Sequence, residues 1–149
     1  MNLYIQTSLY QDNKYVPHLL EHCVLFSQER SDFFTYYNGV EGTTFYGYTD
    51  LEFTAPLTVD EVLHKITQPI SLATFSFQKR VIADELKNAT YSQKLREKFY
   101  QVLANTPQIV ANKVQKGISL ELLNAYQKEW YQEQHMLLIK DDEQIDFTF

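Results

Sequence analysis

The sequence lacks several features that would assign a protein to a particular class. A single cysteine, Cys23, excludes an internal disulfide, which fits a reducing compartment. The N-terminus has no basic segment followed by an apolar run, and no stretch reaches the roughly 18 apolar residues of a membrane span. No cluster of lysine and arginine stands out, and the formal net charge is −6. We therefore expect a cytoplasmic protein that binds neither nucleic acid nor a membrane.

Glycine and proline are also scarce, at four each, whereas the 149 residues include 11 tyrosines and 10 phenylalanines. The hydrophobic fraction of 44% is enough for a real core, and the charged fraction of 21% argues against a disordered chain. The length suggests one domain. We expect the large aromatic side chains to fill the core and to contribute to an interface.

The most informative stretch is Pro17 to His22, which reads Pro-His-Leu-Leu-Glu-His. On an α-helix, residues four apart lie on the same face, so His18 and His22 can direct their rings at one point beside the helix. Two imidazoles from one turn form half of a typical zinc site. Glu21 flanks the same point without having to be a ligand, which suits a base that acts on metal-bound water.

The motif also has a simpler interpretation. His-x-x-Glu-His fixes only three positions, and the polar face of a helix can hold two histidines and a glutamate by chance. The neighbouring residues Leu19, Leu20 and Val24 make this helix broadly apolar, and buried polar groups need partners, which a metal would supply. The choice between the two interpretations depends on a third ligand and on the surrounding sequence.

Apolar spacing and turn residues predict the remaining elements. We expect helices over residues 17–26, 60–70, 76–103 and 119–131, with Thr58 and Ser119 as helix caps. We expect strands within residues 3–10, over 43–56, over 136–139 and over 145–149. This order predicts an α+β fold, in which helices pack on one face of a mainly antiparallel sheet.

Glu85 is unusual within the helix expected over residues 76–103. It lies between Ile82 and Leu86, and a carboxylate among core-facing aliphatic residues is costly unless it is paired or bound to a metal. A surface glutamate beside the apolar stripe is the competing interpretation.

His-x-x-Glu-His is the signature of the inverzincin peptidases. Four stretches, in the right order, resemble one inverzincin family, the M16 peptidases, which include pitrilysin, insulin-degrading enzyme and the mitochondrial processing peptidases. Residues 17–26 resemble the metal helix of that family, and residues 42–54 resemble a strand in which Gly42, Thr49, Glu52 and Thr54 match. Residues 77–88 resemble the helix that brings a third ligand. Residues 120–140, with Trp130-Tyr131, resemble a helix ending in paired aromatics that leads to a short strand.

The resemblance implies a zinc endopeptidase. It implies Zn²⁺ held by His18, His22 and Glu85, with a water in the open fourth position. It also implies that Glu21 accepts the proton of that water and passes it to the leaving amine.

The resemblance further implies that an extended peptide pairs with the strand around Tyr46, Gly47, Tyr48 and Thr49. Two departures from the family fall at or near the site. The family's Asn-Ala is Tyr46-Gly47 here, and a second family glutamate, seven residues before the third ligand, is Gln78.

The chain is shorter than a family domain. We therefore expect residues 1–149 to be a single M16-like domain, truncated on the C-terminal side and active only with a homologous partner subunit, in a hetero-dimer or homo-dimer. Short members of this kind suggest maturation of a small peptide such as a bacteriocin or leader peptide.

Two other functions compete with the peptidase. The first is a non-catalytic M16-like subunit that binds peptide or a partner chain, since some family members have lost the zinc residues. The second is a helical core protein with a fortuitous motif. Metal analysis separates the peptidase from the core protein, and an activity assay separates it from the interaction subunit.

Other candidate ligands are weaker. Cys23 follows His22 directly and points about 100° away around the helix, which favours a small core residue. His64 and His135 have no neighbouring ligand in the sequence, and Asp84 faces away from Glu85 on the helix.

Overall fold

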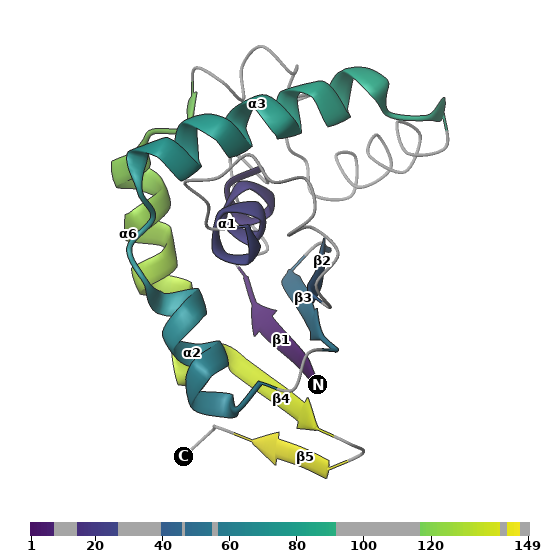
Figure 1. The fold of residues 1–149 in the computed structure, drawn as a ribbon, viewed down its shortest axis with the longest axis vertical. Coiled ribbons are helices and arrows are strands. Elements are labelled where there is room, and N and C mark those ends of the chain that lie inside the picture. Colours follow the sequence, from purple (N-terminus) through teal and green to yellow (C-terminus); the bar gives the residue numbers. More distant parts are fainter. Residues whose placement is uncertain are drawn as a thin grey trace.

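The computed structural model describes residues 1–7, 15–26, 40–45, 47–54, 57–91, 117–140 and 143–146. These residues form an α+β fold in which helices cover one face of an antiparallel sheet (Figure 1). The helices are α1 (Tyr15–Leu25), α2 (Val59–Thr67), α3 (Leu72–Asn88) and α6 (Leu120–Trp130), followed by the short 3₁₀ helix η2 (Glu133–His135). The strands are β1 (Asn2–Gln6), β2 (Val40–Thr44), β3 (Tyr48–Phe53), β4 (Met136–Lys140) and β5 (Glu143–Asp146).

The sheet has the order β2-β3-β1-β4-β5, and each neighbouring pair is antiparallel. The N-terminal strand β1 is central, since Ile5 lies opposite Thr49 on one side and Met136 on the other. In the described part of the chain, β2 and β5 are the edge strands. The expected α+β class and antiparallel sheet are therefore confirmed.

One face of the sheet forms the core together with α1. Successive side chains of a strand point to opposite faces, and alternate residues of β1, β3 and β4 are buried. Helix α1 contacts β2, β3 and the three other helices, and its residues are nearly all buried. It lies between the sheet and α3, which crosses it in Figure 1. The motif helix is therefore the central helix of the fold.

Side-chain caps begin three of the helices. Thr58 and Glu61 form a complete capping box at α2, as expected for this cap position. Ser71 caps α3 and Ser119 caps α6, each by accepting a backbone N–H three residues later. These caps confirm Thr58 and Ser119 as helix starts.

Two elements differ from the sequence prediction. The single strand expected over residues 43–56 is a hairpin, β2 and β3, and the backbone of Gly47 adopts a φ of 91° between them. Glycine adopts this left-handed conformation without steric cost, so the turn can reverse the chain there. The long helix expected over residues 76–103 instead begins at Leu72 and ends at Asn88, where Ala89 is extended. Residues 92–103 lie outside the described residues.

The other expected elements are confirmed within one to four residues, except that residues 8–10 and 147–149 lie outside the described residues. Among the helices of the described residues, none has both the length and the apolar character that crossing a membrane requires.

Candidate metal centre

Helix α1 presents His18 and His22 on one face. Their ring centroids lie 4.8 Å apart and their planes are nearly perpendicular, at 78°. The His22 side chain is only 7% exposed, whereas that of His18 is 29% exposed. The i, i+4 spacing therefore places the two rings together at the border of the core, as the sequence predicted.

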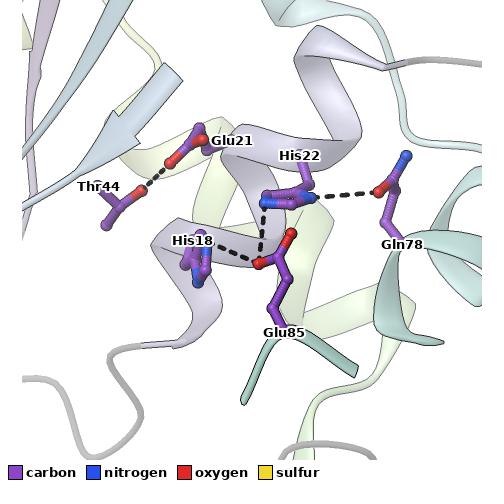
Figure 2. A network of polar contacts seen from close by, with 6 residues as sticks. All are labelled: His18, Glu21, His22, Thr44, Gln78 and Glu85. Carbon is purple, nitrogen blue, oxygen red and sulfur yellow. Dashed lines mark hydrogen bonds and ion pairs between the residues drawn. The ribbon is translucent and has the colours of Figure 1, made fainter. Parts of the chain in front are cut away.

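Helix α3 brings Glu85 to the same point. Glu85 Oε2 lies 3.7 Å from His18 Nε2 and 3.7 Å from His22 Nε2 (Figure 2). The three candidate ligand atoms all lie within 4.8 Å of one another. Two ligand atoms of a tetrahedral zinc ion, each about 2.0 to 2.2 Å from the metal, are roughly 3.3 to 3.6 Å apart. The spacing is too long for direct hydrogen bonds but close to that of ligands around one ion.

The ionisation of these residues argues against a salt bridge between His22 and Glu85. Burial lowers the pKa of His22, and the hydrogen bond with Gln78 only partly opposes that effect. Burial also raises the pKa of Glu85. His22 is therefore neutral at neutral pH, so its contact with Glu85 is not an ion pair, and a neutral imidazole is the form that binds metals.

Gln78 lies seven residues before Glu85 on α3, and its side chain orients His22. Its side-chain oxygen Oε1 lies 3.3 Å from His22 Nδ1, and the residue is fully buried. An amide oxygen accepts hydrogen bonds, so Nδ1 carries the proton and the lone pair of Nε2 faces Glu85. Gln78 thus makes to His22 the kind of contact that a carboxylate or carbonyl often makes to a metal-binding histidine.

Glu21 is a second carboxylate beside the cluster and is almost completely buried. Its pKa is raised to about 7, mainly by burial, and the charge of Glu85 raises it further. A hydrogen bond donated by the Thr44 hydroxyl to Glu21 Oε2 opposes the shift. A carboxylate with a pKa near neutrality is suited to accept and then release a proton.

The structure brings together His18, His22 and Glu85, with Glu21 next to them on α1 (Figure 2). The expected substrate-binding residues are placed differently. Gly47 lies in the hairpin turn, and Tyr46 lies outside the described residues. Thr49 in β3 is opposite both Ile5 and Thr44.

The predicted pairing of a peptide with the strand at Tyr48 and Thr49 is therefore wrong. Both sides of that segment are occupied, because the carbonyl of Tyr48 accepts the backbone N–H of Phe45 and β1 pairs on the other side. Among the described residues, the unpaired edge on this side of the sheet belongs to β2, the partner strand in the hairpin. Side-chain contacts of Tyr48 with a substrate stay a prediction.

Sequence reasoning missed the contact between Thr44 and Glu21. Thr44 follows Glu21 by 23 residues and is not one of the matching residues in the stretch 42–54, so only the register of β2 against β3 places it over α1. Gly42 was recognised as a matching residue, but its place against the Glu21 side chain was not. Hydrogen bonds between sheet and helix leave no local pattern in the sequence.

The weaker ligand candidates stay apart from the cluster. Cys23 is fully buried, and burial raises the pKa of its thiol to about 12, which confirms a core residue. His64 contacts Gln68, the ring of His135 lies against that of Trp130 in a tilted arrangement, and Asp84 pairs with Lys87. A cavity of about 530 Å³ lined by His64, Tyr131 and η2 residues contains none of the three metal-ligand candidates.

No protein-family model, curated protein or solved structure matches this chain. The resemblance to M16 peptidases therefore stays a prediction from the motifs in the sequence.

Proposed function

We propose that this chain is a zinc-dependent endopeptidase subunit, in which His18, His22 and Glu85 hold the metal and Glu21 transfers protons. The observation that carries the proposal is the convergence of two imidazole nitrogens and one carboxylate oxygen within 4.8 Å, beside a second, buried carboxylate. Distant segments of the chain supply these groups, so the arrangement is not a consequence of the helix motif alone.

The donor set supports zinc over harder ions. Two imidazole nitrogens and one carboxylate oxygen suit zinc, whereas magnesium and calcium prefer oxygen ligands throughout. Three protein ligands also leave a position open, which distinguishes catalytic from structural zinc sites. When bound, zinc supplies a Lewis acid for a carbonyl group and lowers the pKa of a water molecule.

Glu21 is the proposed general base. Its raised pKa means that the free carboxylate is about half protonated at neutral pH, and a nearby cation would favour the ionised form. The ionised carboxylate can accept a proton from water and then, as the acid, donate it to the leaving amine of the peptide.

The edge of β2 that pairs with no other described strand is the proposed substrate-binding edge. An extended peptide can add to an exposed sheet edge through main-chain hydrogen bonds. Strand β2 contacts α1, and its Thr44 reaches Glu21, so a peptide along this edge would pass beside the metal centre. The hairpin ends in a stacked, partly exposed pair, Phe45 and Tyr48, which offers an aromatic surface for a substrate side chain.

The proposed partner is a homologous subunit. The side chain of Glu85 is 44% exposed, so the metal centre is open on the α3 side. The stabilisation of a developing oxyanion needs donors in a water-excluded site, and a second subunit on this open side can supply them. Exposed apolar side chains of α3 and α6, at Leu72, Phe77 and Leu122, offer contact area for it. Maturation of a small peptide fits such a two-subunit enzyme.

Metal analysis is the first test. We expect about one zinc per chain, measured by elemental analysis after dialysis against trace zinc. His18→Ala, His22→Ala and Glu85→Ala should each lose most of it, since two ligands do not form a stable site. Asp84→Ala, one residue before Glu85, is the matched control and should keep the metal. Unchanged zinc in the Glu85→Ala variant would contradict the third-ligand assignment.

Peptide cleavage is the second test, in the presence of the product of the neighbouring gene. Zinc-dependent hydrolysis that requires both chains would support the proposal. A zinc-loaded pair that binds peptide without cleaving it would instead indicate an interaction subunit.

A further inference from the structure

The carboxylate of Glu21 meets the edge strand β2 at two points. Thr44 donates a hydrogen bond from Oγ1 to Glu21 Oε2 (Figure 2). Two residues earlier, Gly42 leaves the space that the rest of the side chain occupies. A Cβ atom at Gly42 would lie 2.7 Å from Glu21 Oε1, 2.8 Å from Glu21 Cγ and 2.5 Å from Leu25 Cδ1. One oxygen is thus held by a hydroxyl, and the other has room only because residue 42 has no side chain.

The sheet fixes both contacts in position. Gly42 and Thr44 lie on the same face of β2, because side chains alternate along a strand. They are opposite Leu51 and Thr49 of β3, both of which are fully buried. Strand β3 is paired in turn with the central strand β1. The contacts to Glu21 therefore come from a strand anchored in the core of the sheet rather than from a loop.

We propose that Thr44 and Gly42 are positioning residues that fix the carboxylate of Glu21, so that the strand that receives the peptide also holds the base. The first half of this inference, the fixing of Glu21, stands on the contacts alone. The second half rests on the proposed function, since it assumes a peptide paired with the free edge of β2.

The consequence for catalysis is a fixed spacing between base and substrate. A misplacement of a reacting group by about 1 Å can cost on the order of 10²-fold in rate. Because one short strand would set the place of the peptide bond and of Glu21, movement of β2 would shift both together. The observed contacts of Thr44 and Gly42 are with Glu21 and Leu25, so their loss should leave zinc binding intact.

A double-mutant cycle tests the fixing of Glu21 without any activity. Thr44→Val and Glu21→Leu are made singly and together, and unfolding by urea is measured at pH 8 on the metal-free protein. A hydrogen bond to a charged acceptor should appear as a coupling of roughly tenfold or more in the unfolding equilibrium constant. Thr43→Val, the neighbouring exposed threonine on the opposite face, is the matched control and should show no coupling. A coupling below about twofold, or an equal coupling for the control, would overturn the proposal.

Gly42 is tested by the same cycle. Gly42→Ala is combined with Leu25→Ala, which removes the Leu25 methyl group from the position of the new Cβ atom. The remaining overlap is with Glu21, so the coupling between Thr44 and Glu21 should be lost in this background. Full retention of the coupling would show that Gly42 has no part in positioning the carboxylate.

Kinetics of the zinc-loaded enzyme, with its partner, test the second half. Thr44→Val should lower kcat by about 10- to 100-fold with zinc content and KM unchanged, whereas Thr44→Ser, which keeps the hydroxyl, should restore most of the rate. Coupling without any cleavage would refute the peptidase and leave the positioning intact. Cleavage by Thr44→Val at the full rate would refute the positioning and leave the peptidase intact.

Discussion

The two halves of the candidate metal centre differ in how the chain builds them. Helix α1 supplies His18, Glu21 and His22 within five residues, and Glu21 and His22 are buried against the sheet and α3. Helix α3 supplies Glu85, whose side chain is 44% exposed. The α1 half is fixed by the geometry of one helix, whereas the α3 half depends on how two helices pack. Changes at Glu21 in the first half should therefore alter the chemistry, whereas changes at His18, His22 or Glu85 should alter the affinity for the metal.

The largest expected effect separates the two carboxylates. Glu21→Gln should retain zinc but lose about 10² to 10⁴-fold in cleavage rate, because an amide cannot accept the proton. Glu85→Gln should instead weaken zinc binding. Zinc content and kcat of the two variants, measured side by side, check this contrast. Normal cleavage by the Glu21→Gln variant would refute the assignment of the base.

Glu21, in the α1 half of the site, should also lower the stability of the metal-free protein. The pKa of Glu21 in the folded protein is about 7, above its ordinary value of 4.5, mainly because of burial. The folded protein therefore favours the protonated carboxyl group of Glu21 more than the unfolded chain does. The stabilisation that this gives is complete below about pH 4.5 and is lost as the pH rises through about 7. The loss is about 3 kcal/mol, from roughly 1.4 kcal/mol per pKa unit.

We therefore expect Glu21→Gln to stabilise the metal-free protein at pH 8 relative to wild type, and to do so much less at pH 5. Urea unfolding in the presence of a chelator at the two pH values measures this. Equal differences between variant and wild type at both pH values would show that Glu21 does not titrate in this range. A buried carboxylate that destabilises the metal-free fold is consistent with a functional role.

Gln78 provides a test of how α3 contributes to the affinity for zinc. Gln78→Ala removes the acceptor for His22 Nδ1–H and should weaken zinc binding by about 10- to 100-fold. Gln78→Glu keeps an acceptor and adds a charge, so it should bind zinc at least as tightly as wild type. Competition with a chromophoric chelator gives both affinities. Wild-type affinity in the Gln78→Ala variant would mean that burial alone orients His22.

The smallest expected effect concerns the buried hydroxyl group of Tyr131. The Tyr131 hydroxyl is buried and makes no hydrogen bond of ordinary geometry among the described residues. Burial raises the pKa of this phenol well above its ordinary value, and the nearby Thr49 hydroxyl offsets little of that effect. Tyr131→Phe removes a poorly paired polar group, so the free energy of unfolding should change by less than about 1 kcal/mol, in the stabilising direction. A clear loss of stability would indicate that the hydroxyl has a partner, such as a bound water.

The sequence predicted those parts of the site that depend on short-range geometry. His18, Glu21 and His22 follow from helical spacing, and Thr58 and Ser119 from capping chemistry. Glu85 was found because a carboxylate among aliphatic residues is unusual and because the surrounding helix resembles a known one. By contrast, Thr44 was missed, since its contact depends on the register of a strand against a helix that lies far from it in the sequence. The hairpin was missed because β-branched and aromatic residues continue on both sides of Gly47.

The position of β1 at the centre of the sheet has a consequence for how the protein folds. β1 pairs with β4, where Asn2 lies opposite Ile139, so residues from the two ends of the described chain must meet before the sheet is complete. Contacts between such distant residues slow folding, because a long loop must close before they form. During synthesis, the motif helix would leave the ribosome before β4, so one side of β1 would stay unpaired until β4 had been made. The candidate metal centre would therefore gain its full support only after β4 had been made.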